Sequence, residues 1–169
     1  LAASNSKPQV SIRVNRLKIS RKDLAEKLRE KGFQVEHGRL SERALFVKGS
    51  GLLDTEEFEN GLFSVQDESS ILAAEILAPK SGETIIDVCA APGGKTLAIS
   101  EIMANTGRVL AFDIYDHKLE LLKKEAQRLG ISIIETGDQD GTVLCEELIQ
   151  SADRVLVDGP CSGLGVIRR

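Results

Sequence analysis

The chain has 169 residues, of which 41% are hydrophobic, 28% are charged and three are cysteines. No apolar run approaches the roughly 20 residues that a membrane-spanning helix needs, and no secretory signal opens the chain. Three cysteines in no metal-ligand spacing favour a reducing compartment over disulfides or zinc, so we expect a cytoplasmic protein without a metal. The first residue is Leu, and we expect the chain to be a piece of a longer protein.

Charge is distributed unevenly along the chain. The net charge is −4, but residues 1–33 hold nine Lys or Arg and three acids, a net of +6, and the remainder holds 13 basic and 23 acidic residues, a net of −10. A basic N-terminal segment followed by an acidic remainder is typical of a module that faces phosphates, attached to a module that binds a small molecule. A solvated helix face explains the charge equally well, so charge alone leaves both interpretations open.

The first part of the chain, residues 1–60, has the pattern of a small α+β module. Polar and apolar residues alternate as they do in a half-buried strand, and a Ser with an Asp three residues later marks the start of a helix. The predicted elements are a strand at 11–19, a helix from Ser20 to Gly32, strands at 33–37 and 43–49, and a connector at 54–70.

The second part, residues 61–169, alternates strands and helices, which predicts a parallel, doubly wound sheet. The chain stops shortly after the fourth strand, so we expect the last strands of the sheet to be missing. The predicted elements are a helix at 69–79, strands at 83–89, 107–113, 131–138 and 153–158, a helix from the first turn to about residue 104, a helix at 116–129, and a helical or irregular segment at 141–150.

The turn after the first of these strands reads DVCAAPGGKT, residues 87–96. GGKT suggests a phosphate-binding loop, but that loop needs a Gly five residues before the Gly-Lys pair, and Cys89 stands there. An ATP-binding nucleotidase is therefore a weak alternative. A tight strand-to-helix turn without any ligand is a second alternative.

An acid at the end of the next strand indicates a different ligand. Asp113 follows Gly93 by twenty residues, and a carboxylate there can accept hydrogen bonds from both hydroxyls of a ribose. The dinucleotide pattern G-x-G-x-x-G is absent, so nothing marks a site for a pyrophosphate. S-adenosylmethionine has the ribose and lacks the pyrophosphate, and the small residues of the turn allow a close approach of its methionine part. These small residues are Ala90, Ala91, Gly93 and Gly94.

The stretch DGPCSGLG, residues 158–165, follows the fourth strand and brings Asp158 and Cys161 to the same sheet edge. A Cys in such a place is either a nucleophile or a small buried hydrophobe. Methylation of a pyrimidine at carbon 5 favours chemistry, because that carbon is a poor nucleophile until a thiolate adds at carbon 6. An acid beside the ring nitrogen would stabilise the resulting enamine.

Together with RVNRLK and GLFSVQDESS nearer the start, these two stretches resemble the Sun/Fmu group of bacterial RNA (cytosine-5) methyltransferases, which act on small-subunit ribosomal RNA. The resemblance covers nearly the whole chain. It implies an α/β, Rossmann-like S-adenosylmethionine-dependent methyltransferase sheet, truncated at its C-terminal side, behind a small RNA-binding module. We expect a monomer whose partner is small-subunit ribosomal RNA.

The resemblance also implies which residues form the site. An acid next to the adenine is Asp138, with Asp140 as the alternative, and Asp158 lies beside the base and the methyl group. The implied cofactor contacts are Cys89, Ala90, Ala91, Pro92, Gly93, Gly94, Lys95, Asp113, Asp138 and Asp158, and the expected RNA contacts are Arg13, Arg16 and Lys18.

Two features depart from the family pattern, and the second concerns catalysis. The family usually has Ala where Gly159 stands. In enzymes of this type the Cys after Pro, here Cys161, helps release the methylated base, and the attacking thiolate belongs to a Thr-Cys pair on a later strand. No Thr-Cys pair occurs in this sequence. We therefore expect the fragment to be inactive, and the alternative is a non-catalytic RNA-binding or ribosome assembly factor with a retained methyltransferase fold.

Overall fold

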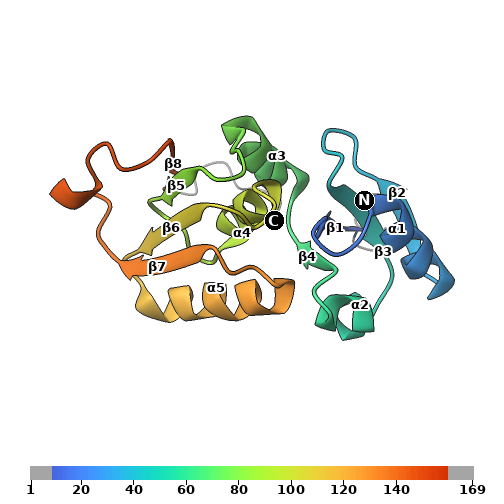
Figure 1. Ribbon diagram of the computed structural model, residues 1–169. Helices are drawn as coiled ribbons and strands as arrows, with labels where there is room; N and C mark the ends of the chain where they lie inside the picture. Colours follow the sequence, from blue (N-terminus) through green and yellow to red (C-terminus); the bar gives the residue numbers. More distant parts are fainter. Residues whose placement is uncertain (1–8, 160–169) are drawn as a thin grey trace, which may run out of the picture.

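The computed structural model describes residues 9–159, which form two units lying side by side, each built on a four-stranded sheet (Figure 1). In the first unit all neighbouring strands are antiparallel, in the order β2-β3-β1-β4. Its strands are β1 (Gln9–Val14), β2 (Gln34–His37), β3 (Ala44–Lys48) and β4 (Phe63–Val65), and its first helix is α1 (Arg21–Glu30).

Helix α1 forms as the sequence predicts. The Ser20 hydroxyl accepts a hydrogen bond from the Asp23 backbone N–H at 3.1 Å, which satisfies one of the free donors at the start of a helix. Leu24, Ala25 and Leu28 are fully buried against the sheet. The helix ends just before Gly32, where the prediction placed its end.

Strand β1 is shorter than predicted, because it ends at Val14 rather than at residue 19. The backbone N–H groups of Lys18 and Ile19 both donate to the Asn15 carbonyl, which closes a turn in place of the last predicted strand residues. Ile12, Arg13 and Val14 are all fully buried, since β1 lies between β3 and β4 and is covered on both faces.

The predicted connector at 54–70 is largely structured. It contains the end of η2 (Leu52–Asp54), the helix α2 (Glu56–Glu59), the strand β4 and the start of α3 (Glu68–Leu77). Because β4 pairs with β1, the first sheet extends past residue 60, where the sequence placed the boundary between the units. A strand of three residues is too short to show a periodicity of its own.

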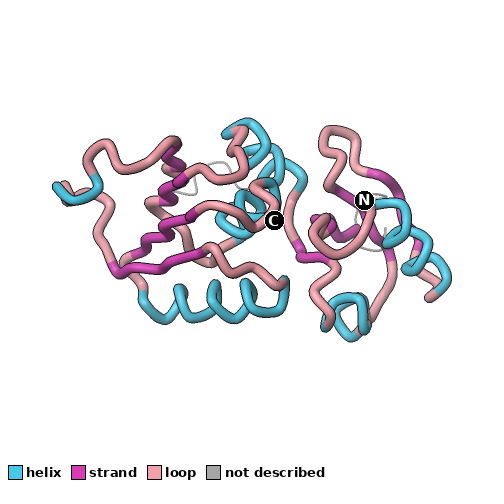
Figure 2. Tube along the Cα trace, viewed as in Figure 1, coloured by secondary structure: helices cyan, strands magenta, loops and turns pink. Residues whose placement is uncertain are grey.

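The second unit is the predicted parallel sheet, with strand order β7-β6-β5-β8 (Figure 1). The segment at 141–150 is irregular apart from one short helix, η3 (Figure 2). The strands are β5 (Thr84–Asp87), β6 (Arg108–Asp113), β7 (Ile134–Asp138) and β8 (Arg154–Leu156), and the helices are α4 (Gly94–Ile102), α5 (Asp116–Leu129) and η3 (Glu146–Leu148).

The two faces of this sheet are covered differently. Ile85 and Val109 point to the face on which α3 and α4 pack, and Ala111 packs with α5. Ile86 and Phe112 alternate with them and point to the opposite face. There they line a mostly apolar cavity of about 430 Å³ beneath residues 139–149.

Polar contacts, those of Asn15 buried and those of Lys18 at the surface, join the two units at the C-terminal end of α5. The Asn15 side-chain amide donates to the carbonyls of Gly61, at 2.8 Å, and Leu129, at 2.9 Å. The Lys18 ammonium donates to the carbonyls of Asn60 and Arg128, both at 2.9 Å. Since the last carbonyls of a helix have no partner within it, the first unit caps α5.

Replacing Asn15 by Ala should destabilise the protein by about 1–3 kcal/mol, because two carbonyls at the junction lose their shared donor. The measurement is urea denaturation followed by circular dichroism. Arg16→Ala, at the exposed neighbouring position, is the control and should change the free energy of unfolding by no more than about 0.5 kcal/mol. Equal stability of both variants would contradict this role for Asn15.

Candidate functional site

A cavity of about 590 Å³ opens at the carboxyl edge of the parallel sheet, where ligands of doubly wound folds bind. Four of the predicted cofactor contacts line it: Cys89, Ala91, Asp113 and Asp158. The other predicted contacts (Ala90, Pro92, Gly93, Gly94, Lys95 and Asp138) are not among its lining residues. The remaining lining residues are Val88, Ile114, Tyr115, Lys118, Asp140, Gly141, Thr142, Val157 and Gly159.

The turn between β5 and α4 needs its first glycine for packing. Gly93 has φ +110°, and a Cβ there would lie 2.4 Å from Leu122 Cδ1 on α5. Ala90 is buried, and its N–H donates to the Phe112 carbonyl at 2.8 Å. Gly93 is therefore needed for close packing, which agrees with the alternative that this is a tight strand-to-helix turn without a ligand. That alternative does not explain the cavity beside the turn.

Asp113 is fixed at the end of β6 by two backbone groups. Its Oδ2 accepts from the Ala91 N–H at 3.1 Å, and its Oδ1 accepts from the Tyr115 N–H at 3.0 Å. Both carboxylate oxygens are thereby oriented, and each keeps further lone pairs for hydroxyl donors. The carboxylate is held in the cavity wall in a form suited to a diol such as a ribose.

Lys95 and Asp158 form an ion pair across the sheet edge. The Lys95 Nζ, in the first turn of α4, donates to the Asp158 Oδ2 beyond the end of β8. About half of the Asp158 side chain is exposed, which leaves it accessible from the cavity. The pair connects the cofactor turn to the segment that carries the predicted catalytic residues.

Asp87, the last residue of β5, was not predicted as a site residue. Its side chain is almost completely buried, its Oδ2 accepts from the Thr96 hydroxyl at 2.7 Å, and its Oδ1 has no hydrogen-bond partner within residues 9–159. Burial raises the pKa of Asp87 to about 6, although the Thr96 hydroxyl opposes the shift. The sequence contained a sign of this residue, because Asp87 is the first residue of DVCAAPGGKT and ends a predicted strand directly before the glycine turn.

The described cysteines lie in different environments. Cys89 lies in the wall of the cavity, and burial raises the pKa of its thiol, with Asp113 and Asp87 adding to the effect. A thiol held neutral is a poor nucleophile, so Cys89 is unsuited to attack a base. Cys145 lines the apolar cavity on the other face of the sheet. The predicted release residue, Cys161, lies outside the described residues.

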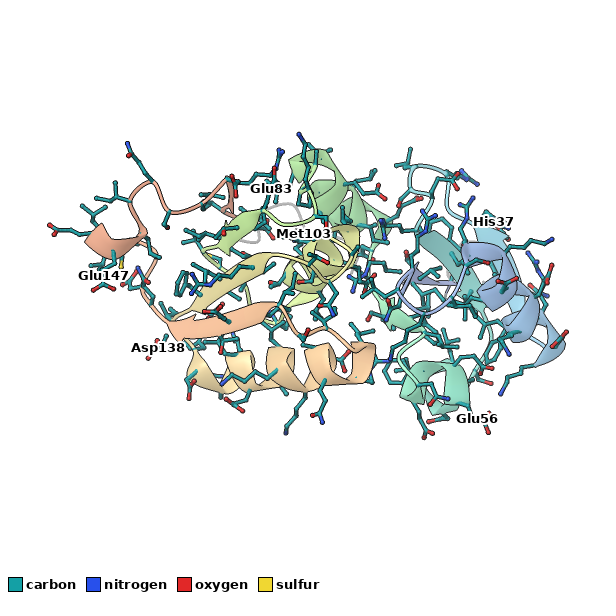
Figure 3. All side chains as sticks on the ribbon, viewed as in Figure 1. His37, Glu56, Glu83, Met103, Asp138 and Glu147 are labelled. Carbon is teal, nitrogen blue, oxygen red and sulfur yellow. The ribbon has the colours of Figure 1, made fainter. Side chains whose placement is uncertain are left out.

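The sequence leaves open whether Asp138 or Asp140 contacts an adenine. Asp138 lies at the carboxyl end of β7, level with Asp113 on β6, and its side chain is exposed (Figure 3). Asp140 lines the cavity, and its Oδ1 accepts from both the backbone N–H and the hydroxyl of Thr142, which lowers the pKa of Asp140.

The structure corrects one of the three expected RNA contacts. Arg13 is fully buried and forms an ion pair with Glu101 of α4, so no phosphate can reach it. Lys18 is at the surface, but its ammonium is bonded to the two carbonyls at the end of α5. Of the three, Arg16 alone has an exposed side chain with neither an ion pair nor a hydrogen bond within residues 9–159. The alternation of polar and apolar residues predicted that Arg13 would face solvent. In the structure, the second unit covers this face of β1.

Two further observations concern the described part of the chain as a whole. Between residues 9 and 159, no helix is both long enough and apolar enough to cross a membrane. The same residues contain no cluster of three or more His, Cys, Asp or Glu side chains that could hold a metal ion.

The free energy of unfolding should depend on the protonation of Asp87. Because its pKa rises from the usual 3.8 to about 6 on folding, the linked stability is complete below about pH 3.8 and is lost as the pH rises to about 6. The loss amounts to about 3 kcal/mol, since one pKa unit is worth about 1.4 kcal/mol. Urea denaturation from pH 3.5 to 7 should show this decline, and Asp87→Asn should remove it. Parallel curves for variant and parent would contradict the assignment.

Two family profiles match the sequence. The profile described as 16S rRNA methyltransferase RsmB/F matches residues 74–169, and a ferredoxin-like domain of RsmF/B-like methyltransferases matches residues 1–52. The elements of the first unit follow one another in the ferredoxin-like order β-α-β-β-α-β, apart from the short helix η2.

Individual relatives are similar over nearly the whole chain. A Bacillus subtilis protein named "Probable ribosomal RNA small subunit methyltransferase B" is 45% identical over 96% of the chain, which spans only 36% of that protein. The human 28S rRNA (cytosine(4447)-C(5))-methyltransferase is 37% identical over 100% of the chain and 21% of its own length. The crystal structure of a methyltransferase homolog from Pyrococcus horikoshii is 33% identical, with a TM-score of 0.84 over 99% of the chain and 55% of its own.

Proposed function

The chain belongs to the RsmB/F family of 16S rRNA methyltransferases, and we propose that the protein to which it contributes transfers a methyl group from S-adenosylmethionine to carbon 5 of a cytosine in small-subunit ribosomal RNA. The observation that carries the proposal is the cavity at the carboxyl edge of the sheet. Asp113 and Asp158 line this cavity together with Cys89 and Ala91 of the turn after β5. The chain covers little more than a third of the Bacillus relative, so the activity of the whole protein is part of the proposal.

The residues of the cavity fit this cofactor. Asp113 would accept hydrogen bonds from the ribose hydroxyls, and an acid after β7, Asp138 or Asp140, would contact the adenine. The turn from Cys89 to Lys95 would hold the methionine part, and the acids of the cavity favour a ligand that carries positive charge. When bound, the cofactor supplies the methyl group as an electrophile.

The proposed chemistry on the base needs two cysteines and an acid. A thiolate adds to carbon 6 of cytosine while the ring nitrogen N3 takes up a proton, and a hydrogen bond between Asp158 and N3 would stabilise the resulting enamine, whose carbon 5 is nucleophilic. After methylation at carbon 5, loss of its proton and elimination of the thiolate regenerate the aromatic base, a step in which Cys161 assists. The thiolate would come from a Thr-Cys pair, which the 169 residues do not contain.

A second candidate function is an RNA-binding or ribosome assembly factor that keeps the methyltransferase fold without turnover. This alternative would be favoured if the parent gene encoded no Thr-Cys pair after Arg169. A Thr-Cys pair in the reading frame of the parent gene after Arg169 would exclude this alternative.

Calorimetric titration should show binding of S-adenosylmethionine or its demethylated product, and no binding of ATP. Asp113→Ala should weaken cofactor binding by about 1.5–3 kcal/mol, the range for hydrogen bonds to a charged group. Asp116→Ala, at an exposed position three residues later, is the matched control and should bind like the parent. Equal affinities of Asp113→Ala and the parent would contradict the ribose assignment.

RNA binding should weaken steeply with salt, because phosphate contacts release counterions. Arg16→Glu should flatten the dependence of the logarithm of the affinity on the logarithm of the salt concentration, by about one unit of slope for each phosphate contact that is lost. Filter binding with small-subunit ribosomal RNA at several salt concentrations measures this slope. An unchanged slope would mean that Arg16 is only a solvated surface residue.

The 169-residue chain by itself should not methylate RNA, since no thiolate is available to attack carbon 6. The test incubates the chain with labelled cofactor and ribosomal RNA, beside a longer protein that includes the Thr-Cys strand. The longer protein should form a covalent adduct with RNA that contains 5-fluorocytidine, and Cys161→Ser should make an adduct with unmodified RNA accumulate. Methyl transfer by the 169-residue chain that Cys161→Ser abolishes would instead identify Cys161 as the nucleophile.

A further inference from the structure

Arg13 has more partners than an ion pair requires. Its guanidinium is fully buried in β1, and Nη2 donates to Glu101 Oε1 at 2.9 Å, with Nε also directed at the same carboxylate. Nη1 donates to the side-chain oxygen of Gln66 and to the backbone carbonyl of Gly94 at 2.8 Å. One side chain of the first unit therefore contacts α4 at two places.

The two contacts with Arg13 lie near the two ends of α4. Gly94 is the first residue of α4 and Glu101 lies seven residues later, so both fall on one face of the helix. The turn that lines the cavity, with Val88, Cys89 and Ala91, ends directly before Gly94. The Arg13 guanidinium binds the Gly94 carbonyl and the Glu101 carboxylate at the same time, and so it holds α4 in one position. Because the turn that lines the cavity leads directly into α4, the position of this turn depends on the same contacts.

Stability alone is a weak reason for such a buried charge. The desolvation of two ions offsets most of their attraction, and well-packed apolar residues of similar volume are often as stable. The Arg fork has donors in a fixed plane, which suits it to hold a carboxylate and a carbonyl in one arrangement, and a Lys ammonium lacks this geometry. An Arg at this position therefore indicates that the Glu101 carboxylate and the Gly94 carbonyl have to be held in a fixed arrangement.

We propose that Arg13 is a positioning residue, which reaches from the RNA-facing unit to hold the start of α4 and with it the turn that contacts the cofactor. The two units then form one body, so the position of the bound RNA is fixed relative to the methyl donor. This inference rests on the proposed function for the identity of the cofactor, but the contact with Gly94 is independent of that identity.

Three variants of the chain separate positioning from stability. Arg13→Lys keeps a cation beside Glu101 and loses the fork. The double variant Arg13→Met with Glu101→Leu replaces the ion pair by apolar volume and removes the contact with Gly94. Arg154→Lys is the control, because the Arg154 guanidinium also bonds a carboxylate, that of Glu83, and a backbone carbonyl, that of Leu77, but forms no hydrogen bond or ion pair with α4 within residues 9–159.

Two readouts are compared with the global stability of each variant from urea denaturation. The first is hydrogen exchange of the backbone amides at 88–96 in the protein without cofactor, and the second is the affinity for S-adenosylmethionine. Arg13→Lys and the double variant should lose about tenfold in affinity, as expected for one hydrogen bond from a charged group, and their turn amides should exchange about tenfold faster. Arg154→Lys should show neither change.

The proposal is overturned if the turn amides of the double variant exchange as in the parent, or if all three variants change only in proportion to their global stability. Failure of the unaltered chain to bind S-adenosylmethionine would contradict the proposed function instead, and the exchange rates would still decide the role of Arg13.

Discussion

The buried ion pair of Arg13 with Glu101 is one of the contacts that connect the two units of this protein. Its groups lie far apart in the sequence, one in an inner strand of the antiparallel sheet and the other in α4, the helix that follows the glycine turn. Since neither charge has contact with water, each depends on the other, and burial raises the pKa of Glu101 against the opposing effect of Arg13. The arrangement of the two units and the start of α4 are therefore linked.

The composition of the cofactor cavity follows from the parallel sheet. Strands that run in the same direction end at one edge, so the residues after β5, β6 and β8 meet there although long segments separate them in the chain. Asp113 and Asp158 reach the same cavity in this way. Asp87 ends its strand at this edge too, but it points into the protein, where the Thr96 hydroxyl is its partner.

The basic segment of the first unit shows how the tertiary structure separates residues of one type. Arg13 is buried between the units, Lys18 caps the end of α5, and Arg16 remains exposed. Most of this short segment therefore serves the junction, and the net positive charge of the first 33 residues overstates how much of it is available to a phosphate. The polar residue between them, Asn15, belongs to the same junction.

The α/β class, the parallel strands, the bounds of α5 and the acids at the sheet edge could be predicted from the amino-acid sequence, because periodicity, helix capping and the spacing of motifs act over short distances along the chain. Three other features became visible in the folded chain: β4 joins the first sheet, Arg13 is buried, and Leu122 leaves no space for a side chain at Gly93. Each of these depends on a contact between segments far apart in the sequence, and no local pattern of polar and apolar residues records which segment will cover which. Burial, which decides whether a charge meets solvent or another charge, is a property of the assembled fold.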